Sequence, residues 1–141
     1  MLFRSCTEAL TAIELADWVI LGPGSWYTSV LPHLLLPEMR EALCNTAARR
    51  CLTMNLATDT KETAGMTAAD HLRVLREYAP EFTIDVILAD PASVQDLPDF
   101  EAAAGMLGAE VVLGKVGASG RRPVHDPLRL ATAYHDIFGN S

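Results

Sequence analysis

The segment "VILGPGSWYTSVLP", residues 19–32, joins an apolar run to the start of a helical pattern through a loop of glycine, proline and hydroxyl side chains. None of its residues is charged, so the backbone itself is the first candidate for holding a ligand. Gly22 and Gly24 permit backbone angles that are closed to other residues, and they let a ligand approach the peptide groups. The segment therefore predicts a buried strand, a tight turn and a helix, in that order.

Four short apolar runs indicate strands, at residues 18–21, 51–55, 84–88 and 110–114. Helical patterns lie between and after them, at residues 29–47, 67–79, 97–107 and 126–138. Because each run is apolar and does not alternate with polar residues, we expect every strand to be buried on both faces. In the 67–79 helix, we expect Leu72, Leu75 and Tyr78 near one face.

Strands that alternate with helices of this length predict right-handed crossovers and a parallel sheet covered by helices. The expected fold is α/β, a Rossmann-like three-layer arrangement of about four parallel strands with flanking helices. Residues 1–141 are expected to form a single domain. Little of the sequence precedes the first strand, and three-layer sheets usually carry more strands, so four suggest a small domain or part of a larger fold.

The amino-acid composition indicates a globular protein and disfavours a nucleic-acid-binding or membrane role. Half of the 141 residues are hydrophobic, 21% are charged and the formal net charge is −7, which is typical of a globular protein with an acidic surface. Such a surface repels nucleic acids and anionic lipids, so neither is an expected partner. No stretch resembles a signal peptide or a membrane span, and a cytoplasmic location is expected. Cys6, Cys44 and Cys51 lack metal-ligand spacing and are expected to be buried thiols.

The loop after the first strand is placed where parallel sheets bind ligands, beyond the carboxyl end of the strand. Ser25, Thr28 and Ser29 supply hydroxyl groups that can cap the next helix or meet a phosphate. Tyr27 occupies the third glycine position of the dinucleotide fingerprint, so known phosphate motifs do not match. A simple strand-to-helix turn, with Thr28 or Ser29 as the N-cap, is an equally good interpretation of these residues.

A second polar loop follows the next strand in "NLATDTKETAGMTAADH", residues 55–71. It should bring polar side chains to the same sheet edge, from Asn55, Thr58, Thr60, Glu62 and Thr63. Thr67 and Asp70 have the spacing of a capping box, so a structural role is expected for Asp70. His71 is expected to be either exposed or packed.

The segment "GKVGASGRRPV", residues 114–124, indicates a flexible loop after the last strand. Arg121 and Arg122 could bind phosphate, although such a pair is more often solvated. Asp126 before Pro127 has the pattern of a helix start. No catalytic triad, paired carboxylates or metal cluster can be argued from spacing. The residues alone predict an anion-binding α/β domain with an unknown catalytic group and no metal.

Four ordered motifs resemble the bacterial gluconeogenesis-factor family, whose members are relatives of 2-phospho-L-lactate transferase. They are "ADWVILGPGSWYTSVLPHLLLPEMREAL" (16–43), "NLATDTKETAGMTAADHLRVL" (55–75), "IDVIL" (84–88) and "HDPLRLA" (125–131). The resemblance covers about the C-terminal half of a family member, which implies a fragment or a truncated product. His33, Asp59 and Thr60 depart from the residues usual in the family.

This resemblance implies a regulatory protein that binds a UDP-sugar or another nucleotide and acts in carbon metabolism, cell-wall synthesis and cell shape. One alternative is a phospholactate-type transferase of deazaflavin cofactor synthesis. Another is a remnant that has lost its ligand. Carried over from the family, the ligand-site residues are Gly22, Gly24, Ser25, Thr28, Ser29 and Asn55, followed by Glu62 and Thr63. If N-terminal strands are missing, the sheet has an open apolar edge, and we expect self-association through it.

Overall fold

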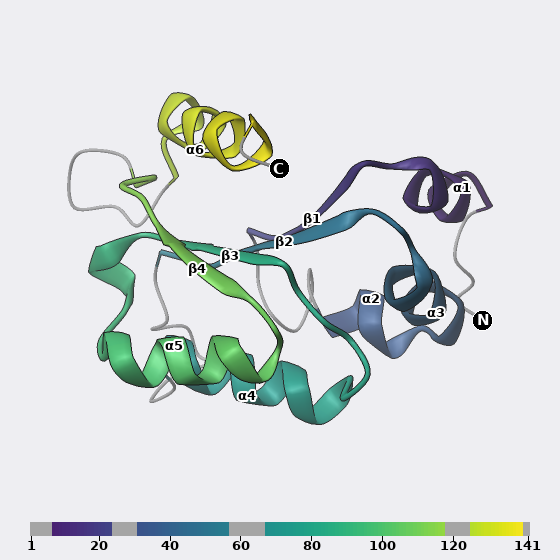
Figure 1. Ribbon diagram of the computed structural model, residues 1–141, viewed down its shortest axis with the longest axis horizontal. Coiled ribbons are helices and arrows are strands. Elements are labelled where there is room, and N and C mark those ends of the chain that lie inside the picture. Colours follow the sequence, from purple (N-terminus) through teal and green to yellow (C-terminus); the bar gives the residue numbers. More distant parts are fainter. Residues whose placement is uncertain (1–6, 24–30, 57–66, 118–124, 140–141) are drawn as a thin grey trace.

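The computed structural model describes residues 7–23, 31–56, 67–117 and 125–139 (Figure 1). The helices are α1 (Thr7–Leu15), α2 (Leu31–Leu35), α3 (Pro37–Asn45), α4 (Ala68–Tyr78), α5 (Leu97–Met106) and α6 (Pro127–Gly139), with a short 3₁₀ helix at Pro91–Ser93. The strands are β1 (Trp18–Leu21), β2 (Arg49–Thr53), β3 (Val86–Ala89) and β4 (Glu110–Leu113).

The four strands form one parallel sheet in the order β1-β2-β3-β4. Leu21 pairs with Leu52, Leu52 with Ile87, and Ile87 with Val111, so the strands end close to one another at one edge. Helices α4 and α5 cover one face, and α6 lies on the opposite face (Figure 1). The α/β, Rossmann-like prediction is confirmed.

The two faces of the sheet are covered unequally. The larger core, which includes Leu52, Leu72, Ile87 and Phe100, lies between the sheet and the helices on the side of α4 and α5. The smaller core contains Cys51, Val86, Leu88, Val116 and Ile137 of α6. Both cores depend on alternate residues of the same strands, which explains why the strand sequences are apolar without alternation.

The expectation that every strand is buried on both faces is correct for β3 and wrong for β1 and β4. All four residues of β3 are buried. In contrast, Ile20 of β1 and Leu113 of β4 are each 40% exposed. These two strands lie at the ends of the described sheet, so each has a neighbouring strand on one side only.

Element boundaries differ from the sequence predictions for local reasons. Helix α1 precedes β1 and was not expected. The 29–47 pattern divides into α2 and α3, because Leu36 is extended and Pro37 starts a new helix. Strand β2 begins at Arg49, before the apolar run, since Arg50 finds acceptors in the carbonyl groups of Leu43 and Cys44 at 2.6 and 2.8 Å.

Other differences concern single side chains. Leu72 and Leu75 of α4 are buried, but Tyr78, the last residue of the helix, is 49% exposed. Cys51 is a buried thiol as expected and Cys44 is half-buried, while Cys6 lies outside the described residues. No helix in the described parts of the chain is long and apolar enough to cross a membrane.

Candidate functional site

The predicted site residues that the structure describes lie at the carboxyl edge of the sheet. Gly22 directly follows β1, and Asn55 is the second residue after β2. Since Leu21 pairs with Leu52, the two loops leave the sheet from neighbouring strands. The other predicted ligand-site residues lie outside the described residues: Gly24, Ser25, Thr28, Ser29, Glu62 and Thr63.

Gly22 has a backbone conformation that favours glycine. Its φ angle is +75°, which is in the left-handed region that other residues rarely adopt. The peptide bond between Gly22 and Pro23 is cis. The turn therefore needs a glycine at position 22 for its geometry, as the sequence predicts, whether or not a ligand binds there.

At this edge, the side chain of Asp90 accepts hydrogen bonds from three main-chain N–H groups. The sequence analysis did not predict a role for Asp90. It directly follows β3 and is only 9% exposed. One carboxylate oxygen, Oδ1, accepts the N–H of Ala92 at 2.9 Å, and the other, Oδ2, accepts the N–H groups of Val116 and Gly117, each at 3.1 Å. A single side chain therefore fixes the segment that leaves β4 against the end of β3.

The segments around Gly117 and His125 pair as a short antiparallel bridge. The N–H of Asp126 donates to the carbonyl of Val116 at 2.7 Å. Asp126 also caps α6 as predicted, because its Oδ1 accepts the N–H groups of Leu128 and Arg129 at 2.9 and 3.0 Å. His125 is therefore held at the neck of the loop between β4 and α6, beside Asp90.

Burial and hydrogen bonding set the ionisation of this pair. Burial by itself would raise the pKa of Asp90, but the hydrogen bonds from Ala92, Gly117 and Val116 outweigh it and hold the pKa below its ordinary value. Burial lowers the pKa of His125, against a hydrogen bond to the main chain of Met54 and the charge of Asp90. At neutral pH the site thus contains a charged carboxylate beside a neutral imidazole.

Two further contacts tie the loop after β2 to its surroundings. The hydroxyl of Ser93 donates to the carbonyl of Leu56 at 2.8 Å. The hydroxyl groups of Thr53 and Tyr134 share a short hydrogen bond, which joins the end of β2 to α6. Asn55 lies between these two anchored positions, which limits the movement of its backbone.

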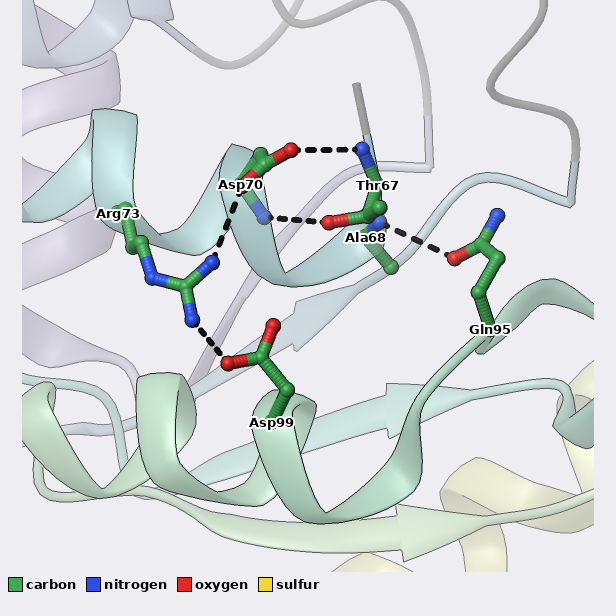
Figure 2. Close-up of polar contacts among 6 residues, drawn as sticks. All are labelled: Thr67, Ala68, Asp70, Arg73, Gln95 and Asp99. Carbon is green, nitrogen blue, oxygen red and sulfur yellow. Dashed lines mark hydrogen bonds and ion pairs between the residues drawn. The ribbon is translucent and has the colours of Figure 1, made fainter. Parts of the chain in front are cut away.

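At the start of α4, side chains of the protein accept hydrogen bonds from the free main-chain N–H groups (Figure 2). Thr67 Oγ1 accepts the N–H of Asp70 at 3.1 Å, and Asp70 Oδ2 accepts the N–H of Thr67 at 3.0 Å, so the predicted capping box is confirmed. Arg73 bridges Asp70 and Asp99 of α5, and Gln95 accepts the N–H of Ala68. This helix start therefore serves to anchor the loop, and His71 behind it is buried.

A cavity of about 430 Å³ lies elsewhere, between α1 and α3. Its lining includes Glu14, Glu38 and Glu41. Three carboxylates disfavour a phosphate-bearing ligand, so this cavity does not compete with the carboxyl edge as an anion site. Among the residues that the structure describes, no three His, Cys, Asp or Glu side chains gather in a way that could hold a metal ion.

Comparison with known proteins agrees with this architecture. A family model described as 2-phospho-L-lactate transferase CofD matches residues 3–107. A protein of Mycobacterium tuberculosis (strain CDC 1551), which its name proposes as a gluconeogenesis factor, is 45% identical over 133 residues, covering 92% of this chain and 39% of that protein. The gluconeogenesis factor of Bacillus subtilis (strain 168) is 39% identical over 92 residues, covering 65% of this chain and 28% of that protein.

A crystal structure of a UPF0052 family member from Bacillus halodurans has a TM-score of 0.79 and 30% sequence identity. The match covers 92% of this chain and 46% of that one. The chain thus spans less than half the length of these relatives. The family model ends before β4, so Asp90 lies within the matched residues and His125 lies beyond them.

Proposed function

The chain belongs to the 2-phospho-L-lactate transferase CofD family, and on that premise we propose that it binds a UDP-sugar at the carboxyl edge of its sheet. Its role would be regulatory, in carbon metabolism, cell-wall synthesis and cell shape. The observation that carries the proposal is the convergence of Gly22 and Asn55 at one edge of a parallel sheet. In open α/β sheets, ligands bind beyond the carboxyl ends of the strands.

Calorimetry with UDP-N-acetylglucosamine tests the proposal, on this chain and on a full-length relative. Saturable heat with the relative is expected. No heat at millimolar ligand would exclude a UDP-sugar. Binding by the relative but not by this chain would mean that residues 1–141 do not bind the ligand by themselves.

Gly24→Val tests whether the loop after β1 contacts the ligand. The β-branched side chain disfavours unusual backbone angles and blocks approach to the loop N–H groups, so affinity should fall more than stability. Ser25→Ala should be milder, since one hydrogen bond to a charged group contributes roughly 1.5–3 kcal/mol. Gly105→Val is the matched control, because a Cβ at Gly105 meets no atom within 4 Å.

The second candidate function is a phospholactate-type transferase, which the description of the matching family model favours. It predicts turnover with a guanylylated phospholactyl donor and a deazaflavin acceptor in the presence of magnesium. Product formation in that assay would replace the regulatory proposal with an enzymatic one. Absence of product with a relative that binds UDP-N-acetylglucosamine would eliminate the transferase.

The proposal includes self-association through β1. This strand lies at the end of the described sheet, and its Ile20 is 40% exposed. An unpaired strand edge offers N–H and C=O groups to a second copy of the same chain. Sedimentation at micromolar concentration should show dimers or larger species, and Ile20→Lys should reduce them. A stable monomer of the unaltered chain would contradict this part of the proposal.

A further inference from the structure

The cavity between α1 and α3 lies at the edge of the sheet opposite to the proposed ligand site. Helices α1 and α3 end shortly before β1 and β2 begin, and the two helices pack against each other (Figure 1). The proposed ligand site is at the other ends of these strands. An occupant of the cavity would therefore bind independently of a ligand at the carboxyl edge.

Helix α1 forms one wall of the cavity and is held by few contacts. None of its nine residues is buried, and a helix of this length is only marginally stable by itself in water. The carbonyl group of Ile13 accepts a hydrogen bond from the Thr46 hydroxyl at 2.8 Å, and Ile13 also packs against the larger core. Leu10 and Glu14 line the cavity instead. These contacts fix the wall and leave Leu10 for an additional apolar partner.

The cavity combines half-buried apolar residues with exposed acidic ones. Its volume is about 430 Å³, which lies within the range of typical binding pockets. Leu10 and Ala42 are half-buried in its lining. Glu14, Glu38 and Glu41 are exposed in the same lining. The first pair of residues favours an apolar group, and the three carboxylates favour positive charge.

A neighbouring cavity of about 370 Å³ gives an internal comparison. It shares Glu41 and Asn45 with the first cavity, and its lining also includes Glu81. There the chain supplies its own cation, because Arg40 Nε lies 3.3 Å from the Glu81 carboxylate. In contrast, the three glutamates of the first cavity form no ion pair with any described residue. The charge that complements them must come from outside the described parts of the chain.

We propose that the cavity between α1 and α3 docks a basic, amphipathic segment of a partner protein. An apolar side chain of the segment lies against Leu10 and Ala42, and its Lys or Arg side chains lie against the glutamates. A small cation would neutralise the carboxylates but leave the apolar residues in contact with water. A phosphate group or an acidic segment is repelled by the three carboxylates. The basic, amphipathic segment complements both parts of the lining.

The probe for this proposal is a short synthetic peptide of leucine and lysine, with its leucines on one side of a helix. It should bind the unaltered chain, and its affinity should fall as salt is added, because exposed charge pairs are screened. Glu38→Gln/Glu41→Gln should bind it about three- to tenfold more weakly, as expected for the loss of two exposed ion pairs. Glu77→Gln/Glu101→Gln is the matched control, because both glutamates are exposed, on α4 and α5, and the net charge changes equally. Its Kd should not change.

Several results would contradict the proposal. Failure of the peptide to bind the unaltered chain overturns it. Equal weakening in the two doubly substituted chains also overturns it, because net charge would then explain the binding. The same conclusion follows if a peptide with serine in place of leucine binds equally well, or if spermidine binds as tightly as the peptide, since the apolar residues would then have no role.

Two further measurements locate the peptide and identify the occupant. In the unaltered chain, the main-chain amide resonances of Leu10 and Ala42 should move when the peptide saturates it, while that of Glu101 should not. No movement at Leu10 and Ala42 overturns the proposal. In sedimentation, Glu38→Gln/Glu41→Gln should leave any self-association unchanged. If this double substitution reduces self-association more than Ile20→Lys does, a second copy of the chain occupies the cavity, and the proposal of a different partner is wrong.

Discussion

An aspartate lies at each end of β3, and the side chains of the two residues accept different numbers of main-chain N–H groups. Asp85, directly before the strand, is half-buried and accepts one N–H, from Arg50 at 2.8 Å. Asp90, directly after it, is buried and accepts three. An aspartate side chain thus makes one additional hydrogen bond at the amino end of β3, whereas at the carboxyl end it holds two other segments of the chain in place.

The backbone explains the difference. At the amino end, the sheet already holds its neighbours, since Asp85 N–H donates to Arg50 and Glu110 N–H donates to Asp85, each at 3.0 Å. At the carboxyl end, the described backbone bonds between β3 and β4 finish with Gly114 N–H to Ala89. Beyond that point a side chain must supply the acceptors, so polar residues at this edge determine the course of the loops.

Replacing each aspartate by alanine should give the largest contrast between the two ends. Asp90→Ala leaves the buried N–H group of Val116 and the half-buried N–H group of Gly117 without their acceptor, so the free energy of unfolding should fall by about 3–4 kcal/mol. Asp85→Ala should cost about 1 kcal/mol, because it removes one partly exposed hydrogen bond. Urea denaturation measures both, and equal losses would remove the distinction between the two ends.

Gly117→Ala tests how tightly the Asp90 contact is packed. An added Cβ would lie 3.3 Å from Oδ2 of Asp90 and 3.5 Å from Cδ1 of Leu56, and the carboxylate cannot retreat without losing its hydrogen bonds. We expect a loss of about 1–3 kcal/mol.

Gly105→Ala is the control for this change. A Cβ there meets nothing within 4 Å, and alanine favours the helix over glycine, so a gain of about 0.5–1 kcal/mol is expected. Thermal unfolding compares the two variants. If Gly117→Ala were as stable as Gly105→Ala, the carboxyl end of β3 would be less constrained than its contacts indicate.

Thr67→Ala extends the comparison to the second loop at the carboxyl edge. It removes the cap of α4 and should cost about 1 kcal/mol. Thr132→Ala removes a hydroxyl that donates to Leu128 within α6, on an exposed helix face, and should change stability by less than about 0.5 kcal/mol. If the two variants had the same denaturant midpoint, the Thr67 side chain would stabilise the protein no more than an exposed hydroxyl on a helix does.

The pH dependence of stability should show the smallest effect. Because the folded pKa of Asp90 lies below its unfolded value, its stabilising contribution is complete above the unfolded pKa and is lost as pH falls through the folded pKa. Acid should therefore destabilise the protein, by less than Asp90→Ala does. Asp90→Asn should flatten this part of the profile, measured by urea unfolding at a series of acidic pH values, and Asp85→Asn should leave the contribution of Asp90 in place. An unchanged profile in Asp90→Asn would show that other carboxylates cause the acid sensitivity.

The sequence by itself determined the parallel α/β fold and several helix starts. Apolar runs and helical periodicity act over a few residues, so β1, β3, β4 and the helices after them could be placed. The caps Thr67 with Asp70, and Asp126 with Leu128, are also local. The start of β2 was missed because Arg49 and Arg50 are charged, and only their contacts with distant groups, such as Arg49 with the Trp18 ring, let them join a strand.

Only the tertiary structure decided the centre of the candidate site. The sequence placed Gly22 and Asn55 at the carboxyl edge, because each closely follows an apolar strand. It could not identify Asp90, whose partners Val116 and Gly117 are 26 and 27 positions away, or His125, whose ring reaches Met54. A buried polar group is stabilised by whichever segments the sheet brings beside it, and that pairing arises only when β2, β3 and β4 come together and α6 packs across them.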